Sequence, residues 1–592
     1  MKAHYIKSNK SLRLPTAIVF YDTETKHEKI NDLKIHKLKL GVARYVKLEK
    51  SNVVSSKYYI FKDKSRFFDI LESHLRNKNR LWVVSHNQHF DFNLLDGFKE
   101  LLSRQFRITK MVLESDVFII KAVKALSSLV FVDSTNYFKA PLNELGKQIN
   151  LQKLEIDFEN CSEEQLITYC VRDVEILSEY FIKFLRWWST NNLGNFAFSA
   201  AGLAFNAFKH RFMTHKIFVH DNENAIKLEL ESYRGGRNEC FRLGEINEKL
   251  YKLDVNSMYP SVMRFNEYPV KFVKFTRNVT VDKLKELIKK YHVIAKVKLN
   301  TEENAYAYKM HKLIFPIGTF IVTLTTPEIS YALKNDHILD IYECAFYNKA
   351  YIFKDYVDFF YKMKLEAEKS GNKVVRAFAK LLMNSLYGKF AQKVRELSEL
   401  PMPPILDFGT TLYLDSTKGE RFKIYFVNGK AYKLEKQEKL FYDANVAIAS
   451  HVTAYARMYL YELMKTAGLE NVYYTDTDSL IVNETGYNRL KHLVGNELGM
   501  LKLEKEADKA IFFTVKDYIF GDEVKTKGVK PASLKISENM YLNEQWLRTK
   551  SLLTMGYHGT VITKDVIKIL NRIYDKGVVH NDLHIKPFRL TL

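Results

Sequence analysis

Short apolar runs that end beside acidic residues recur along the chain, with lengths typical of buried strands. Five such runs are present: Ala17–Tyr21, Leu81–Val84, Leu129–Val132, Leu250–Leu253 and Asn471–Thr475. Segments with a helical apolar period separate them, notably Glu163–Phe184 and Phe359–Phe390. Strands that alternate with helices in this way predict an α/β protein whose active sites lie at strand ends.

The net charge of the chain indicates a binding partner, and its length indicates several subdomains. The 592 residues carry a formal net charge of +22, with a sequence pI of about 9.3. This excess favours a polyanion such as nucleic acid, because neutralised phosphates release condensed counterions. A merely soluble basic protein is the alternative reading of the charge alone. A chain this long exceeds one comfortable core, so several subdomains are expected.

The location of the protein follows from what the sequence lacks. No apolar stretch approaches the roughly 18 residues that a membrane span needs. Four cysteines without a CxxC pair argue against a disulfide framework and fit a reducing compartment. The segment Met1–Ala17 is basic but has no apolar signal-peptide core. We therefore expect an intracellular protein of the host cytoplasm without membrane contact; a short organellar address is the alternative.

Three acidic motifs in the first third of the chain predict a metal site. Asp22 and Glu24 lie two residues apart in an extended segment, which puts both carboxylates on one side. Asp91 follows the second strand, and Tyr169 and Asp173 share one helix face at i, i+4 spacing. Four carboxylates and a phenol suit two Mg²⁺ ions, which prefer hard oxygen ligands and activate water. A single DxE alone would more often be a solvated loop.

The set DxE, Nx₂FD and Yx₃D, in this order and spacing, resembles the exonuclease motifs of DNA polymerase proofreading domains. The resemblance implies that the four carboxylates hold the metals and that Tyr169 orients the attacking water. It also implies that three residues grip the frayed single strand, with the aromatic one stacked on a base: Thr25, Asn87 and Phe90.

Two further residues look like the strand-gripping elements of the protein-primed subgroup of these polymerases. Ser134 would bind DNA and Lys153 the scissile phosphate. The subgroup usually has an apolar residue after this serine, where the present chain has Thr135. A turn or cap role for Ser134 therefore stays open.

A second group of carboxylates lies far downstream of the first. Asp254 follows the strand Leu250–Leu253. Asp476 and Asp478 occupy the turn of a predicted hairpin whose second strand is Leu480–Val482. Either motif alone could be a turn rich in aspartate, but their co-occurrence favours a second metal site.

The helix between these two motifs carries a polar stripe opposite an apolar one. At 100° per residue the polar residues fall within a narrow sector: Lys373, Arg376, Lys380, Asn384 and Tyr387. The apolar residues lie on the other side: Val375, Phe378, Leu382 and Leu386. A solvated face is the usual reading of such a stripe. A triphosphate on the cations with a base against Tyr387 also explains the amide, the phenol and Gly388.

The patterns Dx₂SxYP, Kx₃NSxYG and YxDTDS resemble motifs A, B and C of family B DNA polymerases. By this resemblance Asp254 and Asp478 bind two Mg²⁺ ions, for which Mn²⁺ can substitute, and Asp476 supports the site. The residues implied to bind the incoming dNTP are Tyr259, Arg376, Lys380, Asn384 and Tyr387. Among them, Tyr259 would exclude a 2′-hydroxyl and Lys380 would contact the triphosphate.

Two smaller elements match the same family. Tyr233, Gly235 and Gly236 resemble the YxGG element that joins the exonuclease and polymerase halves, where glycines let the backbone approach the template. An ordinary turn is the alternative. Lys516 and Tyr518 look like the KxY element that holds the primer terminus.

The resemblance implies an RNase H-like 3′–5′ exonuclease domain followed by a right-hand polymerase with palm, fingers and thumb. The expected ranges are 1–190 for the exonuclease, 191–261 and 441–515 for the palm, 359–390 for the fingers and 516–592 for the thumb. Long spacers at 262–358 and 391–440 match the places where protein-primed polymerases carry insertions, one for a terminal protein and one for strand displacement. A cluster of Pro401, Pro403 and Pro404 marks the second as a loop or insertion.

These observations together predict a template-directed DNA polymerase with proofreading, of the protein-primed branch. Its expected partners are template and primer DNA, dNTPs and a terminal protein, with the enzyme a monomer or a heterodimer with that protein. Three alternatives remain: a nucleic-acid-primed family B polymerase, a non-catalytic basic DNA-binding protein and an exonuclease without polymerase activity.

Overall fold

A computed structural model describes most of the chain. It covers residues 2–30, 33–75, 78–114, 117–394, 397–402, 405–415, 420–427, 429–434, 439–557 and 559–592. Pro403 and Pro404 of the predicted loop, and parts of the 391–440 spacer, lie outside the described residues. No helix in the described part of the chain is both long and apolar enough to cross a membrane.

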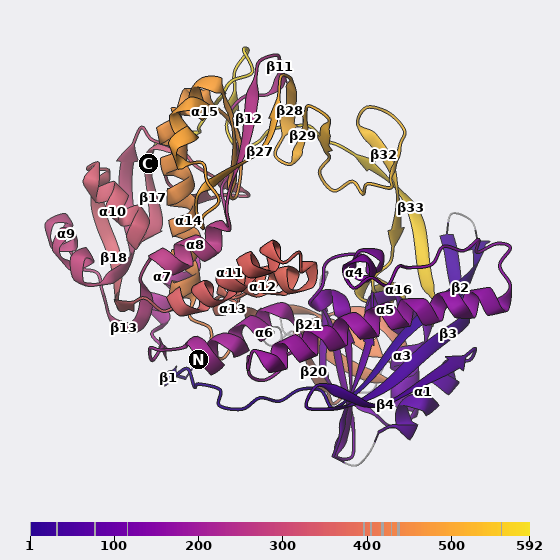
Figure 1. Cartoon of the computed structure of the whole chain (residues 1–592). Coiled ribbons are helices and arrows are strands. Elements are labelled where there is room, and N and C mark those ends of the chain that lie inside the picture. The colour runs from indigo at the N-terminus through magenta and orange to yellow at the C-terminus, as the bar shows by residue number, and fades with distance from the viewer. Residues whose placement is uncertain are drawn as a thin grey trace.

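The N-terminal region is built on one large mixed sheet (Figure 1). Its strands are β2 (Ala17–Ile30), β3 (Leu33–Glu49), β4 (Asn52–Phe61), β5 (Arg80–Ser85), β6 (Arg107–Glu114), β7 (Val117–Lys124) and β8 (Ser127–Asp133). Strands β2, β5 and β8 are mutually parallel, whereas the other neighbours are antiparallel. The predicted strands at residues 81–84 and 129–132 are confirmed, each with slightly wider bounds.

The side chains of β2 alternate between the two faces of this sheet and contribute to a hydrophobic core on each face. Ile18 and Phe20 pack with the helix α5 (Glu163–Thr190), which begins where the sequence predicts. Val19 and Tyr21 face the opposite way, toward α1 (Lys64–Ser73) and α3 (Gly97–Ser103). Because side chains of a strand alternate between faces, one apolar run fills both cores.

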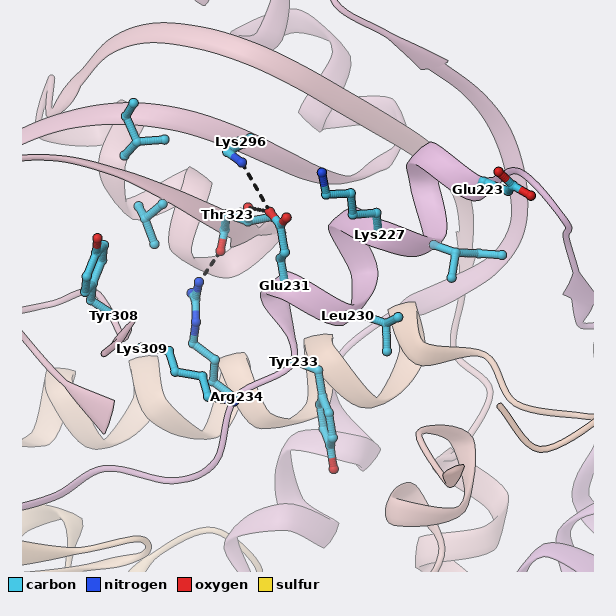
Figure 2. A pocket seen from close by; sticks show the side chains of 13 residues that line it. Glu223, Lys227, Leu230, Glu231, Tyr233, Arg234, Lys296, Tyr308, Lys309 and Thr323 are labelled. Atoms are coloured by element: carbon cyan, nitrogen blue, oxygen red, sulfur yellow. Dashed lines mark hydrogen bonds and ion pairs between the residues drawn. The ribbon is translucent and has the colours of Figure 1, made fainter. Parts of the chain in front are cut away.

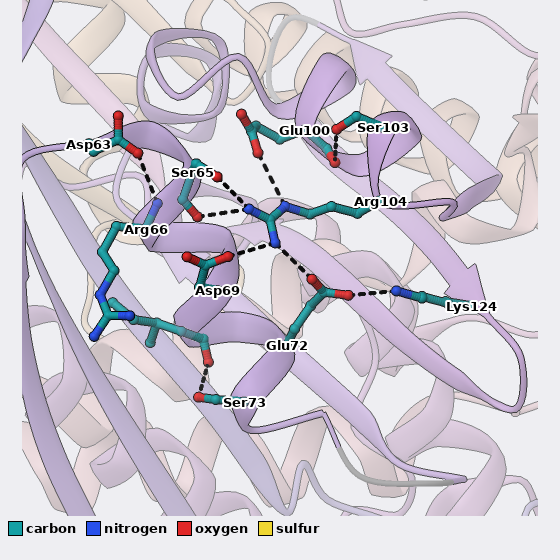
Figure 3. A network of polar contacts seen from close by, with 11 residues as sticks. Asp63, Ser65, Arg66, Asp69, Glu72, Ser73, Glu100, Ser103, Arg104 and Lys124 are labelled. Atoms are coloured by element: carbon teal, nitrogen blue, oxygen red, sulfur yellow. Dashed lines mark hydrogen bonds and ion pairs between the residues drawn. The ribbon is translucent and has the colours of Figure 1, made fainter.

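An ion-pair cluster ties α1 and the end of α3 to strand β7 of the sheet (Figure 3). Arg104, just after α3, pairs with Asp69 and Glu72 of α1 at 2.8 Å each. Glu72 also pairs with Lys124 of β7 at 2.7 Å. The cluster joins α1, α3 and β7 on the face away from α5, so its role is structural.

A second sheet carries the downstream acidic motifs. It is antiparallel, in the order β10-β25-β26-β12-β27. The strands are β10 (Asn238–Cys240), β12 (Leu250–Val255), β25 (Val472–Asp476), β26 (Ser479–Asn483) and β27 (Leu501–Ala507). The long helix α14 (Val446–Ala467) packs on this sheet. Its buried residues share one hydrophobic cluster with those of β12 and with Ile18 and Phe20 of β2. The predicted hairpin that carries the downstream aspartates is confirmed as β25–β26.

The 262–358 spacer folds into its own sheet with covering helices. Its strands run in the order β13 (Tyr268–Thr276), β18 (Ile338–Ala350), β14 (His292–Thr301) and β17 (Ile317–Thr325). The helices are α9 (Val281–Lys290) and α10 (Thr326–Lys334). A fifth strand, β36 (Arg589–Leu590), comes from the end of the chain and pairs parallel with β17.

Residues 354–390 form a helical hairpin instead of one continuous helical segment. Helix α11 (Lys354–Lys369) ends before Gly371, whose φ of 67° reverses the chain. Asn372 caps the next helix, α12 (Lys373–Ser385), by accepting a hydrogen bond from the Val375 N–H at 3.1 Å. The short α13 (Tyr387–Phe390) follows. The helical period predicted helix here but missed the reversal.

The 391–440 spacer contributes a small antiparallel sheet, described in the order β20-β23-β22-β21. Its strands are β20 (Leu397–Leu400), β21 (Phe408–Asp415), β22 (Glu420–Val427) and β23 (Lys430–Leu434). Tyr425, Val427 and Tyr432 join the core cluster of α1 and α3. This spacer therefore packs on the N-terminal unit.

Residues 516–592 extend three different sheets. Strands β29 (Asp517–Phe520) and β30 (Glu523–Lys525) join β11 (Gly244–Ile246) and β28 (Ala510–Thr514). Strands β31 (Leu534–Lys535), β32 (Met540–Trp546) and β33 (Val561–Ile569) continue the N-terminal sheet beyond β3, with α16 (Thr549–Met555) between the last two. With β36 on the third sheet, this range links the parts of the molecule (Figure 1).

Candidate active sites

The first carboxylate pair lies inside a strand. Strand β2 continues past the predicted end at Tyr21 to Ile30, with Asp22 opposite Val42 and Glu24 opposite Leu40 of β3. A break in register follows Glu24. The expectation of acids at a strand end was wrong here because the polar residues after the apolar run extend β2 as a hairpin with β3.

The predicted residues of the first cluster come together. Ligand atoms of Asp22, Glu24 and Cys170 all lie within 4.8 Å of one another. The Thr23 hydroxyl donates to Asp91 Oδ1 at 2.5 Å. From the other side, α5 presents two further residues, Tyr169 and Asp173. Lys153 pairs with the Asp173 carboxylate, and its Nζ lies 4.8 Å from the Tyr169 ring centroid.

Crowding of these carboxylates disfavours their charged forms. Burial, and then the nearby charges of Asp91 and Asp173, hold the pKa of Asp22 well above its usual range. Burial raises the pKa of Glu24 to about 7, and it raises the pKa of Asp91 to about 7 as well. Asp173 Oδ1 is buried and has no hydrogen-bond partner among the described residues. An oxygen-rich cluster of this kind fits divalent cations.

Cys170 is a neighbour that the sequence analysis did not single out. Its Sγ lies 3.9 Å from Asp22 Oδ2. Burial and then the charge of Asp22 hold the pKa of this thiol well above its usual value. A neutral thiol is a poor ligand for a hard cation, so the carboxylates remain the ligand set.

The residues predicted to grip a single strand lie beside this cluster. Asn87 has a φ of 96° and precedes the helix α2 (Gln88–Leu94), which carries Phe90 and Asp91. The Asp133 carboxylate accepts from the N–H groups of Asn87 and Gln88 at 3.1 and 2.8 Å and so fixes this turn. Phe90 is partly exposed. Across the site, the Thr25 hydroxyl lies 3.2 Å from His36 Nδ1.

Ser134 does not reach the surface. Its exposed fraction is 0%, and its hydroxyl shares a hydrogen bond of 2.7 Å with His86 Nδ1. This placement corrects the expectation that Ser134 itself contacts DNA, because a fully buried hydroxyl is not accessible to a strand. His86 is the partly exposed member of the pair.

The second cluster forms where β12 meets the β25–β26 turn. Asp254 lies opposite Ser479 in the register of β12 and β26. The Val255 N–H donates to the Asp478 carbonyl at 2.8 Å, and Thr477 occupies the left-handed region with φ 64°. The turn is thereby fixed so that Asp478 lies near Asp254, whereas Asp476 lies on the other side of Ser479.

The charge of this cluster is balanced from the facing helix. Burial raises the pKa of Asp254 to about 7, with further contributions from Asp478 and Glu504, whereas Lys380 acts in the opposite direction. Burial also raises the pKa of Asp478. Glu504, on β27, was not predicted from the sequence because its strand has no recognisable acidic motif. Lys252 Nζ lies 3.4 Å from it.

Helix α12 presents the predicted stripe. Four of its polar residues are exposed, namely Lys373, Arg376, Lys380 and Asn384. On the other side the apolar residues Phe378, Leu382 and Leu386 are fully or almost fully buried. Arg376 is paired with Glu368 of α11 at 2.7 Å. Lys380 is the cation of α12 whose charge lowers the pKa of Asp254.

Two tyrosines stack at the mouth of the second cluster. The rings of Tyr259 and Tyr387 lie 4.7 Å apart, centroid to centroid, at an interplanar angle of 23°. Burial raises the pKa of both phenols, with Tyr233 as a minor neighbour. The stack forms a flat wall of the kind that a sugar or base contacts.

The Tyr233–Gly236 segment is held from behind by a buried ion pair. Arg457 of α14 donates to the carbonyls of Arg234 and Gly235 at 2.8 and 3.1 Å. Its other nitrogen pairs with Glu328 of α10 at 2.8 Å, and both side chains are about 1% exposed. A Cβ at Gly236 would lie 2.8 Å from Thr477 Cγ2, so glycine is required by the aspartate turn. At Gly235 a Cβ would meet only open space.

Beside this segment lies a pocket of about 650 Å³ between α7 (Glu223–Ser232) and the 262–358 sheet. Figure 2 shows Lys296 and Thr323 pointing at Glu231, with Tyr233 directed away from them. The pairs are a Lys296–Glu231 contact of 3.6 Å and a hydrogen bond of 2.9 Å from the Thr323 hydroxyl. Arg234 also lines the pocket, and its Nε is buried without a hydrogen-bond partner among the described residues.

The two residues of the KxY element differ in accessibility. Lys516 is exposed, and its Nζ lies 3.5 Å from Asp476 Oδ1. Tyr518 is only 2% exposed, and its hydroxyl donates to Glu523 at 3.2 Å. Burial of Tyr518 corrects the expectation that both side chains reach a primer, because only the lysine is available.

Comparisons with known proteins agree with this geometry. The sequence profile of a family described as "DNA polymerase type B, organellar and viral" matches residues 54–468. A DNA polymerase of Kluyveromyces lactis is 27% identical over 381 residues, covering 59% of this chain and 37% of the relative. The DNA-directed DNA polymerase of Enterobacteria phage PRD1 is 29% identical over 315 residues, covering 51% and 52%. The matched region thus spans about a third to a half of these relatives' length.

A solved structure gives the fold. Phi29 DNA polymerase, complexed with primer-template DNA and incoming nucleotide substrates, superposes with a TM-score of 0.69 at 18% identity. The alignment covers 94% of this chain and 100% of that one. The predicted fold class, an α/β exonuclease part followed by a right-hand polymerase, is confirmed.

Proposed function

The chain belongs to the type B DNA polymerases of organelles and viruses, and we propose on this basis that it extends DNA primers on a DNA template and trims their 3′ ends. The observation that carries the proposal is the presence of two separate carboxylate clusters on two different sheets. One lies on β2, α2 and α5, and the other lies on β12 and the β25–β26 turn.

At the second cluster, Asp254 and Asp478 are the ligands for two Mg²⁺ ions, and Asp476 supports the turn. When bound, such ions activate the primer hydroxyl and stabilise the charge of the leaving pyrophosphate. Lys380 neutralises triphosphate charge from the facing helix, and the Tyr259–Tyr387 stack shapes the sugar and base pocket. Lys516, next to Asp476, contacts the primer end.

At the first cluster, Asp22, Glu24, Asp91 and Asp173 are the ligands for the second pair of ions. Tyr169 orients the attacking water. Burial raises the pKa of this phenol to about 12, so it stays protonated and keeps a hydrogen to donate. With a metal bound, Asp173 would be one of its ligands, and Lys153, which pairs with Asp173, would contact the scissile phosphate. Asn87, Thr25 and Phe90 hold the unpaired strand.

The resemblance to family B DNA polymerases also suggests how the chain divides into functional ranges. We assign residues 1–190 to the exonuclease, 191–261 and 441–515 to the palm, 359–390 to the fingers and 516–592 to the thumb. The sheet of 262–358 is the docking surface for a terminal protein, and the 391–440 sheet promotes strand displacement.

The direct test measures both activities in one purified protein. With Mg²⁺, it should extend a 5′-labelled primer on a template when dNTPs are present, and shorten the same primer when they are absent. Removal of the ions by EDTA should stop both reactions, and added Mg²⁺ or Mn²⁺ should restore them. A protein that binds DNA but shows neither reaction would be the non-catalytic alternative.

We also propose that initiation uses a protein primer. A polymerase that starts at the extreme end of a linear template has no room for an RNA primer, so a side-chain hydroxyl takes the place of the sugar 3′-hydroxyl. The enzyme, mixed with its terminal protein and labelled dNTP, should form a covalent protein–nucleotide adduct that survives SDS. Asp254→Ala should eliminate it. Normal DNA-primed extension without any adduct would support the nucleic-acid-primed alternative.

Deleting 262–358 would be a poor test of this docking. The deletion would leave Arg457 of α14 buried without Glu328, and it would remove the sheet that holds β36. Exposed apolar residues of β18 offer a milder change, because Leu339 is 54% exposed. Leu339→Asp should reduce adduct formation while DNA-primed extension remains.

A further inference from the structure

Three aromatic rings from distant parts of the chain lie in a row beside the first carboxylate cluster. His36 belongs to β3, Phe90 to α2 and Trp546 to the end of β32. Ring centroids are 5.6 Å apart for His36 and Phe90, and 4.8 Å apart for Phe90 and Trp546. Trp546 keeps 42% of its surface exposed. The rings are tilted against one another, at interplanar angles of 72° and 50°, and the exposed part of Trp546 offers solvent an aromatic surface next to the exonuclease site.

The C-terminal segment is held in this position by polar contacts as well as by strand pairing. Strand β33 pairs antiparallel with β3 through four residues on each side, Val561–Lys564 and Leu33–His36. The buried Thr549 hydroxyl accepts from the Asn93 amide at 2.7 Å and lies 2.9 Å from His89 Nδ1. These contacts fix the strand end that carries the indole against α2, so its place beside the phenyl ring is defined.

We propose that Trp546 forms a second base-binding position of the 3′ single-strand site. The ligand is the unpaired 3′ end of a DNA strand, whose successive bases stack on Phe90 and then on the accessible face of Trp546. Aromatic platforms of this kind bind unpaired bases without sequence preference, because every base has a π face. The proposal rests on the exonuclease function proposed above. It assigns the C-terminal ribbon β32–β33 a direct part in holding the strand that is to be trimmed.

The first test is optical, because the chain has only four tryptophans. Trp82 and Trp188 are buried and Trp187 is partly buried, which leaves Trp546 as the indole most accessible to a base. In the Asp22→Ala, Glu24→Ala protein, a short oligothymidylate should quench tryptophan fluorescence without being degraded. Trp546→Phe in that background should abolish the quench, while anisotropy of a labelled oligonucleotide shows binding nearly unchanged.

The second test separates stacking from support of the fold. In the otherwise unchanged enzyme, Trp546→Ala should raise the KM for single-stranded DNA trimming by roughly tenfold, as loss of one stacked base implies. Its kcat should stay the same, and Trp546→Phe should behave as the unchanged enzyme. Ile569→Ala is the matched control, because Ile569 is 59% exposed on the same ribbon, opposite Met540 at its other end.

Two results would overturn the proposal. One is a quench that persists in the Trp546→Phe protein. The other is a KM of the folded Trp546→Ala protein equal to that of the Ile569→Ala control. Failure of the exonuclease assignment would give a different result, because the enzyme would then trim no substrate at all. The fluorescence experiment would still report whether a strand binds at Trp546.

Discussion

The two carboxylate clusters differ in what balances their charge. In the first, burial and mutual repulsion raise the pKa of Asp22, and Lys153, which pairs with Asp173, lowers this pKa only in part. In the second, Lys380 from the facing helix lowers the pKa of Asp254, against the larger effect of burial. Mg²⁺ usually binds through one or two carboxylates together with substrate phosphates. We therefore expect the first cluster to be a preformed cation site and the second to be completed by a triphosphate substrate.

The strongest test of this division removes one cluster at a time. Asp254→Ala or Asp478→Ala should abolish primer extension and leave 3′ trimming intact, and Asp22→Ala with Glu24→Ala should do the reverse. Loss of a metal that supplies several kcal/mol lowers the rate by about a thousandfold or more. Gel assays of both reactions on one primer-template measure the outcome. Loss of both activities from Asp22→Ala alone, in a folded protein, would contradict two independent sites.

The salt dependence of DNA binding should differ between the two sites. Binding of a primer-template should follow a log–log salt slope of at least roughly −4, which is roughly 250-fold between 50 and 200 mM salt. A short single strand at the first site covers fewer phosphates and releases fewer counterions per phosphate, so its slope should be shallower. Anisotropy titrations give both slopes. A flat slope for the duplex would contradict the interpretation of the +22 charge.

Sugar selection should belong to the second site alone. The Tyr259 ring lies 4.7 Å from the Tyr387 ring, and we expect it to occupy the space that a 2′-hydroxyl would need. Tyr259→Val should raise the efficiency of CTP relative to dCTP by about 10- to 200-fold, the range of steric discrimination in a pocket. Trimming should not change, and Tyr259→Phe serves as the control that keeps the ring. An unchanged ratio would assign the gate to another residue.

Metal-dependent stability should be the smallest effect and should depend on pH. Burial raises the pKa of Glu24 and of Asp91 to about 7, above the unfolded values near 4. Folded protein then binds more protons than unfolded protein, so metal-free stability falls as pH rises from about 4 to 7. Mg²⁺ replaces those protons. It should raise Tm by a few °C more at pH 8 than at pH 5.5, measured by calorimetry.

The two clusters should contribute unequally to this Mg²⁺-dependent rise in Tm. Asp22→Ala with Glu24→Ala should remove most of the Mg²⁺-dependent rise, whereas Asp254→Ala should remove little of it. An equal loss in the two proteins would show that the second cluster also binds its cations without a triphosphate.

Local patterns predicted much of both sites. The apolar runs identified the strands β5, β8 and β12, and the spacing of Lys373 to Tyr387 identified a face that the structure leaves open to solvent. These features depend on neighbours a few residues apart, so they can be read from a single sequence.

The remaining features depend on contacts between distant residues. Glu504 lies in a strand whose more and less exposed residues alternate like those of any half-exposed strand, and only its pairing with β12 brings it to Asp254. Burial of Ser134 and Tyr518 follows from how a short 3-10 helix and strand β29 pack, which a motif does not encode. Trp546 reaches Phe90 only because β33 extends the N-terminal sheet.

The buried pair of Arg457 and Glu328 has a consequence for the order of folding. The two residues are 129 positions apart, and Glu328 is made first. At typical synthesis rates, on the order of ten seconds pass before its partner is made. A buried arginine without its partner is strongly destabilising, so α14 gains little by docking before α10 is in place. We therefore expect the 262–358 sheet to fold early, as the template on which α14 docks.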